Sequence, residues 1–195
     1  MLCGAIIENV LQDSEESIAV AYFFCDYKSR ETQKIEVILG SLAAQIALQN
    51  PRAFEQLEEY YDELHQKGDL ENPVETDRLI AVIQEMASQF GKLYIVVDAL
   101  DECGVETYNI AEALKELVDG AKSINLAVCS REEEDIREVL ADDFGRIEIE
   151  AHTEDLELYV GAEMSQRKNL KDLYIKNPQL NADIRYSLIS RAQGM

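Results

Sequence analysis

The segment LYIVVDALDEC, residues 93–103, decides how this chain folds. Its first five residues are apolar without alternation, and most are β-branched or aromatic. This pattern predicts a strand that is buried on both faces of a parallel sheet. Such a strand delivers Asp98 at its carboxyl end, with Asp101 and Glu102 in the turn that follows. In open α/β sheets, ligands bind at that edge.

The three carboxylates of this segment lie within five residues of one another. Crowding them is unfavourable unless a cation or solvent relieves their repulsion. One interpretation is a Walker B segment, in which Asp98 holds Mg²⁺ while Asp101 and Glu102 orient an attacking water. The alternative is a buried strand that ends in a solvated acidic turn. The segment alone does not decide between them.

The rest of the chain alternates strands with helices. Further strands are predicted at 17–27 and 125–130, and an alternating apolar and charged pattern predicts an edge strand at 146–150. Helices are predicted at 1–12, 36–49, 51–68, 76–90, 108–118, 133–140, 153–164 and 178–194. Because helices connect the strands, we expect an α/β fold with a doubly wound parallel sheet.

Composition narrows the class of protein. The 195 residues are 47% hydrophobic and carry a net charge of −21, which predicts a folded domain that repels nucleic acid and anionic membranes. The four cysteines form no C-x-x-C pair, so their spacing indicates neither zinc nor a disulfide framework. No apolar run approaches the roughly 18 residues of a membrane span. No signal peptide is recognisable. We therefore expect a cytoplasmic protein.

A second polar group follows the strand predicted at 125–130. Ser130 and Arg131 come at its end, about one βα unit after Asp98. Neighbouring strand ends of a doubly wound sheet face the same crevice, where an arginine stabilises charge on a transferring phosphoryl group. The alternative is that Ser130 caps a helix and Arg131 has no role.

Together these segments resemble the NACHT domain of STAND-class P-loop NTPases, in particular the nephrocystin-like NACHT domains of fungal proteins that carry ankyrin or other repeats. The resemblance extends over nearly the whole chain, and the D-A-L-D-E-C and S-R motifs are specific mainly in combination. The matching segments are AYFFCDY (21–27), ILGSLAAQ (38–45), YIVVDALDEC (94–103), VCSR (128–131) and IEAHTEDL (149–156).

The resemblance implies a P-loop NTPase-like, three-layer α/β/α fold, with a partial nucleotide-binding domain at 1–165 and a helical segment at 166–195 that leads toward a winged-helix region. It implies an ATP- or GTP-driven switch that homo-oligomerises and relays a signal to other domains of the same protein. The implied roles are Mg²⁺ ligation for Asp98, positioning of water for Asp101 and Glu102, and phosphate sensing for Arg131, with Ser130 at the nucleotide.

The sequence departs from this family at one motif, because it contains no G-x-x-x-x-G-K-[ST] phosphate loop. We expect the first strand and the Walker A loop to be absent. This chain should then bind neither nucleotide nor Mg²⁺ well by itself, and whether it is an enzyme stays open. The resemblance implies that the absent strand belongs between 146–150 and 125–130. We thus expect a three-strand core in the order 125–130, 93–97, 17–27, with 146–150 detached or weakly paired.

Two other hypotheses remain. The first is a non-catalytic protein-interaction module that retains the NACHT fold and its acidic turn. The second is an unrelated parallel α/β protein in which the D-A-L-D-E turn is a coincidence.

Overall fold

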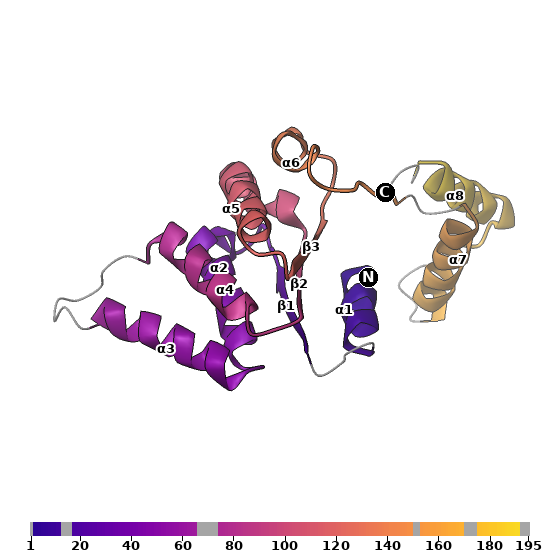
Figure 1. The fold of residues 1–195 in the computed structure, drawn as a ribbon. Coiled ribbons are helices and arrows are strands. Elements are labelled where there is room, and N and C mark those ends of the chain that lie inside the picture. Colours follow the sequence, from indigo (N-terminus) through magenta and orange to yellow (C-terminus); the bar gives the residue numbers. More distant parts are fainter. Residues whose placement is uncertain (1, 13–16, 66–73, 150–152, 170–174, 192–195) are drawn as a thin grey trace. The chain divides into compact units, whose positions relative to one another are not determined.

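The computed structural model describes residues 2–12, 17–65, 74–149, 153–169 and 175–191. The chain divides into two compact units, Met1–Phe144 and Gly145–Met195. The first unit contains, in chain order, α1 (Leu2–Gln12), β1 (Ile18–Phe24), η1 (Arg30–Gln33), α2 (Ile35–Ala47), α3 (Pro51–His65), α4 (Thr76–Ala87), β2 (Lys92–Asp98), η2 (Leu100–Glu106), α5 (Thr107–Gly120), β3 (Ile124–Cys129) and α6 (Glu134–Leu140) (Figure 1). The second contains α7 (Thr153–Asn169) and α8 (Pro178–Arg191).

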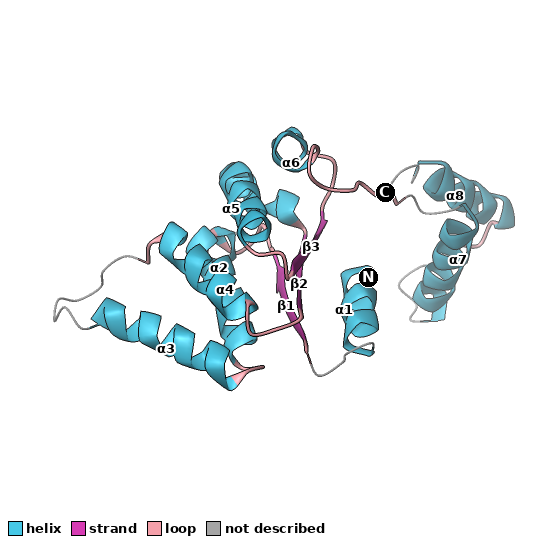
Figure 2. Cartoon of the chain, viewed as in Figure 1, coloured by secondary structure: helices cyan, strands magenta, loops and turns pink. Residues whose placement is uncertain are grey.

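The three strands form one parallel sheet in the order β1-β2-β3, which confirms the predicted order of the core. In the register, Val20 of β1 pairs with Tyr94 of β2, and Ile95 of β2 pairs with Leu126 of β3. Figure 2 shows the strands lying between helices. The chain is therefore an α/β protein in which the strand from the segment 93–103 is central.

Both faces of β2 are buried, as its unbroken apolar sequence predicts. Leu93, Ile95 and Val97 are fully buried in a large core to which α2, α4 and α5 contribute. Val96, on the opposite face, packs with Cys3 and Ile7 of α1 in a second, smaller cluster. Figure 1 shows α1 on one side of the sheet and α2, α4 and α5 on the other. The central strand is thus buried by helices from both sides.

The outer edge of β1 is closed by two glutamines, Gln45 in α2 and Gln49 just after it. Gln49 accepts a hydrogen bond from the N–H of Val20 at 3.1 Å and donates to the Val20 carbonyl at 2.8 Å. Gln45, one turn earlier, makes the same pair of bonds with Tyr22, at 3.1 and 2.8 Å. These side chains satisfy backbone groups that an edge strand would otherwise leave unpaired.

The outer edge of β3 differs. The N–H of Leu93 donates to the carbonyl of Ser123 at 2.8 Å, so in this parallel pair the N–H and C=O groups of Asn125 and Ala127 face β2, and those of Leu126 and Val128 face away from it. In the described ranges of the chain, no hydrogen bond closes this edge at Leu126 or Val128. Among the described residues, the outer edge of β3 is therefore unpaired at these two positions.

Residues 145–149 form no strand, so the predicted edge strand at 146–150 is wrong for these residues; Glu150 lies outside the described residues. Ile147 is 84% exposed and Ile149 is 62% exposed. Alternation of apolar and charged residues produces a strand only where a neighbour pairs with its backbone. The segment 146–149 therefore forms no ladder with the described strands, which agrees with the expectation that it would be detached or weakly paired.

In the second unit, α7 and α8 contact each other. Gly161 of α7 lies beside the guanidinium of Arg185 of α8, where an added Cβ would come within 3.4 Å of Nη2. Met164 of α7 is buried. In the residues described, no helix has both the length and the apolar character needed to span a bilayer.

Candidate functional site at the carboxyl ends of the strands

Asp98 is the last residue of the central strand. In the register it lies between Phe24 of β1 and Cys129 of β3. Its carbonyl accepts a hydrogen bond of 3.0 Å from the N–H of Cys25, so the backbone is fixed where the strands end. Its half-buried side chain lies on the α1 face of the sheet, near Cys3. The sequence prediction that Asp98 sits at the carboxyl end of a buried strand is confirmed.

The chain turns sharply after Asp98. Ala99 has φ 56° and ψ 43°, the left-handed conformation, and is the only non-glycine residue with positive φ in the described ranges. This conformation is unfavourable by about 1–2 kcal/mol for a residue with a Cβ. The turn leads directly into η2, and it brings Asp101 and Glu102 back toward the ends of the two flanking strands.

Asp101 holds the end of β3. Its Oδ1 accepts a hydrogen bond of 3.1 Å from the N–H of Arg131, and its Oδ2 lies 3.8 Å from Nε of the same arginine. The Asp101 side chain is 9% exposed, whereas the Arg131 side chain is 86% exposed. Arg131 is therefore anchored through its backbone N–H, while most of its side chain is exposed to solvent. Ser130, also exposed, immediately precedes it.

Glu102 holds the end of β1 in the same manner. Its Oε2 accepts a hydrogen bond of 3.1 Å from the N–H of Tyr27. The two carboxylates of the turn therefore each fasten one neighbour of the central strand. Sequence reasoning assigned both residues to a water molecule and missed these contacts, since no sequence spacing indicates a bond across 75 residues.

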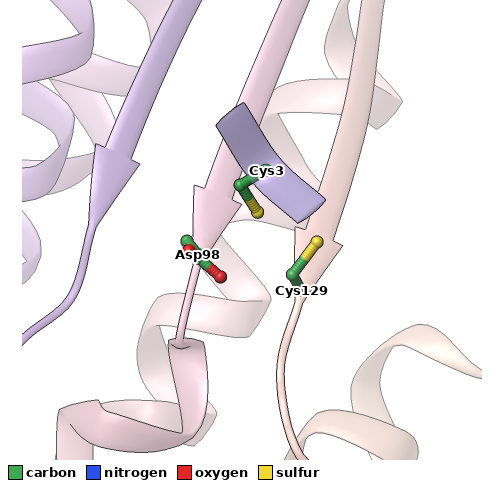
Figure 3. A group of neighbouring side chains, drawn as sticks. All are labelled: Cys3, Asp98 and Cys129. Carbon is green, nitrogen blue, oxygen red and sulfur yellow. The ribbon is translucent and has the colours of Figure 1, made fainter. Parts of the chain in front are cut away.

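Cys3 and Cys129 flank Asp98 on the α1 face (Figure 3). The two sulfur atoms and one carboxylate oxygen all lie within 4.8 Å of one another. Burial raises the pKa of the Cys3 thiol, and its hydrogen-bonding contacts with Cys129 and Asp98 raise it further. Cys3 is the second residue of α1, so this contact places the N-terminus of α1 at the carboxyl end of β2.

The other two cysteines lie on the opposite face, in the large core. Cys25 follows β1 and Cys103 lies in η2. A hydrogen bond with Cys103, together with burial, raises the pKa of the Cys25 thiol. All four cysteines are free thiols, and Cys25 stays protonated at neutral pH.

The structure brings all the residues predicted for the site to one end of the sheet. Asp98, Asp101 and Glu102 follow the central strand, and Ser130 and Arg131 follow β3. Their predicted roles toward nucleotide, water and Mg²⁺ stay predictions. What the geometry provides is a carboxylate, an exposed guanidinium and a helix N-terminus around the same strand ends.

Comparison with known proteins gives one match. Residues 1–131 match the family described as Nephrocystin 3, N-terminal. The match spans every strand of the sheet and ends at Arg131. No curated protein and no solved structure matches the chain.

Proposed function

The chain belongs to the nephrocystin 3 N-terminal family, and on that premise we propose that it is the nucleotide-binding part of a NACHT-type signalling switch. Its ATP or GTP site lies at the carboxyl ends of β2 and β3. Asp98 holds Mg²⁺ there, and Arg131 contacts the terminal phosphate. The switch homo-oligomerises and relays its state to other domains of the same protein.

One observation carries this proposal: the N-terminus of α1 opens beside Asp98, with Cys3 and Asp98 ligand atoms no more than 4.8 Å apart. A helix N-terminus presents unpaired N–H groups and a partial positive charge, which together bind phosphate. A carboxylate beside bound phosphates is the usual partner of their Mg²⁺. A chain of net charge −21 needs a local positive potential to bind an anion. The N-terminus of α1 and the guanidinium of Arg131 would supply it.

The test supplies the phosphate loop that the printed sequence does not contain. A chain extended before Leu2 by a strand and a G-x-x-x-x-G-K-[ST] loop is titrated with Mg²⁺-ATP and Mg²⁺-GTP in a calorimeter. Asp98→Asn should weaken Mg²⁺-dependent binding by about 10- to 100-fold, the equivalent of one charge-assisted contact. Glu102→Gln should leave binding nearly intact and slow hydrolysis.

Asp26→Asn is the matched control, because Asp26 lies just beyond the end of β1 and its carboxylate accepts a bond from the N–H of Lys28 at 2.9 Å. It should leave nucleotide affinity unchanged. Equal effects of Asp98→Asn and Asp26→Asn, or no nucleotide binding by the extended chain, would contradict the proposal.

A second function is favoured by the contacts of the acidic turn. Asp101 and Glu102 both bond to backbone N–H groups of flanking strand ends. These contacts give the two carboxylates a structural role at the strand ends that needs no nucleotide. Such a role suits a non-catalytic interaction module with the NACHT fold. Under this function, Glu102→Gln changes stability but has no hydrolysis to slow.

A further inference from the structure

The group formed by Cys3, Asp98 and Cys129 offers two sulfur atoms and a carboxylate, whereas a Mg²⁺ site uses oxygen ligands. Each residue comes from a different element: the first turn of α1, the end of β2 and the end of β3 (Figure 3). The register pairs Asp98 directly with Cys129, and α1 covers them with Cys3. Two thiols and a carboxylate from three segments therefore converge on one point.

We propose that these three residues form a binding site for a thiophilic divalent cation, Zn²⁺, with Sγ of Cys3, Sγ of Cys129 and one carboxylate oxygen of Asp98 as ligands. Water completes the coordination. This site does not depend on the proposed nucleotide function, because it needs no phosphate loop and no nucleotide.

The geometry is close to what Zn²⁺ requires. In a tetrahedral site with Zn–S of about 2.3 Å and Zn–O of about 2.0 Å, the sulfurs lie about 3.8 Å apart and a sulfur lies about 3.5 Å from the oxygen. The ligand atoms here are all within 4.8 Å of one another. The two sulfurs therefore need to approach by about 1 Å at most, and a sulfur and the oxygen by about 1.3 Å at most.

The surroundings favour a metal with sulfur ligands. The cluster beside the three ligands is apolar, with Val20, Val96 and Ile7 buried in it. Cys3 itself is 1% exposed, whereas Asp98 and Cys129 are half-buried, so the site is buried on the side of the helix and partly exposed to solvent at the strand ends. Thiolates select Zn²⁺ over Mg²⁺, which prefers oxygen ligands.

Metal binding changes the protonation of the site. A bound dication takes both sulfurs as thiolates. One Zn²⁺, two thiols and one carboxylate give the Zn²⁺ complex and release two protons. The bound ion links α1 to the sheet and occupies the carboxylate that the proposed function assigns to Mg²⁺.

The experiment titrates the whole reduced chain with Zn²⁺ alone, against a chromophoric chelator, and repeats the titration with Co²⁺. We expect one metal per chain, release of about two protons near neutral pH, and a sulfur-to-cobalt charge-transfer absorption. Cys3→Ser and Cys129→Ser should each weaken Zn²⁺ binding at least tenfold, since removal of outer-shell partners alone costs roughly 10- to 100-fold.

Cys25→Ser is the matched control, because it makes the same exchange of Cys for Ser just beyond the end of β1. It should leave the affinity for Zn²⁺ unchanged. Alkylation of the unmutated chain gives a reading that does not depend on how a variant folds: Zn²⁺ should slow modification at Cys3 and Cys129 but not at Cys25 or Cys103. Absence of Zn²⁺ binding, equal affinity in Cys3→Ser and Cys25→Ser, or no protection of Cys3 and Cys129 overturns the proposal.

Discussion

The two edges of the sheet are built differently. Along β1, Gln45 and Gln49 bond to both backbone groups of Tyr22 and Val20. Along β3, the outward groups of Leu126 and Val128 have no such partner in the described ranges. The first edge is closed by side chains of α2 and of the turn after it, whereas the second is unpaired at these two residues within the described part of the chain. Within the described residues, the outward backbone groups are therefore paired along β1 but not along β3.

The strand ends show the same contrast. β1 is held along its length by the two glutamines and at its end by Glu102, which accepts from Tyr27. β3 is held at its end by Asp101, which accepts from Arg131. We therefore expect β3 to depend more heavily on its single carboxylate than β1 does.

The largest loss of stability is expected from removing the glutamine side chains that bond to the outer edge of β1. Gln45→Ala with Gln49→Ala deletes four hydrogen bonds to the strand, and at about 1 kcal/mol each, reduced for the exposed pair, this lowers the free energy of unfolding by about 3 kcal/mol. Chemical denaturation measures it. Gln89→Ala is the control, because the side-chain amide of Gln89 donates only to Ser88 within the described residues, and it should change the free energy of unfolding little. A double variant as stable as this control would contradict the role of the glutamines.

A smaller loss is expected at the end of β3. Asp101→Ala removes a charged acceptor that is 9% exposed and leaves the Arg131 N–H without it, which lowers the free energy of unfolding by about 2 kcal/mol. Glu102→Ala, at the end of the better-held β1, should cost about 1 kcal/mol. Asp101→Asn keeps an acceptor oxygen and should recover part of the loss. If Glu102→Ala proved the more damaging, the contrast between the strand ends would be wrong.

The smallest effect concerns association. The open edge of β3 should make the chain self-associate, since unpaired strand edges pair with other chains. Sedimentation velocity should show this as a concentration dependence. Leu126→Pro removes an outward N–H without breaking a bond to β2 and should weaken association at least about threefold. Leu126→Val keeps the N–H and serves as the control.

A monomeric chain with a sharp two-state thermal transition at high temperature would contradict an exposed edge. It would favour the interaction module, which has adapted to a three-stranded sheet.

Sequence reasoning predicted the parts of this structure that depend on local pattern. The unbroken apolar run before Asp98 predicted a central strand, and the order of elements predicted the sheet. It failed at 146–149, where an alternating pattern lacked a strand to pair with. Pattern predicts which residues suit a strand, but the presence of a partner decides whether the strand forms.

The contacts between distant segments were not predictable in the same way. Gln45 lies in the last turn of the mostly apolar α2 and Gln49 follows four residues later, just beyond its end, and two glutamines at this spacing were a usable signal for a polar target. No comparable signal joined Cys3 to Asp98 and Cys129, which meet only because α1 lies over the carboxyl ends of β2 and β3. Spacing along the chain cannot indicate a site assembled from three elements.

The central claim is that the ends of β2 and β3 form a nucleotide site that a phosphate loop completes. Calorimetric titration of Mg²⁺-ATP into the chain as printed, and into the chain extended by the loop, tests it most directly. Three charge-assisted phosphate contacts are worth about 5 kcal/mol or more, so we predict micromolar affinity for the extended chain and millimolar or weaker affinity for the chain as printed. Micromolar binding by the printed chain, or equal affinities of the two, would contradict the account.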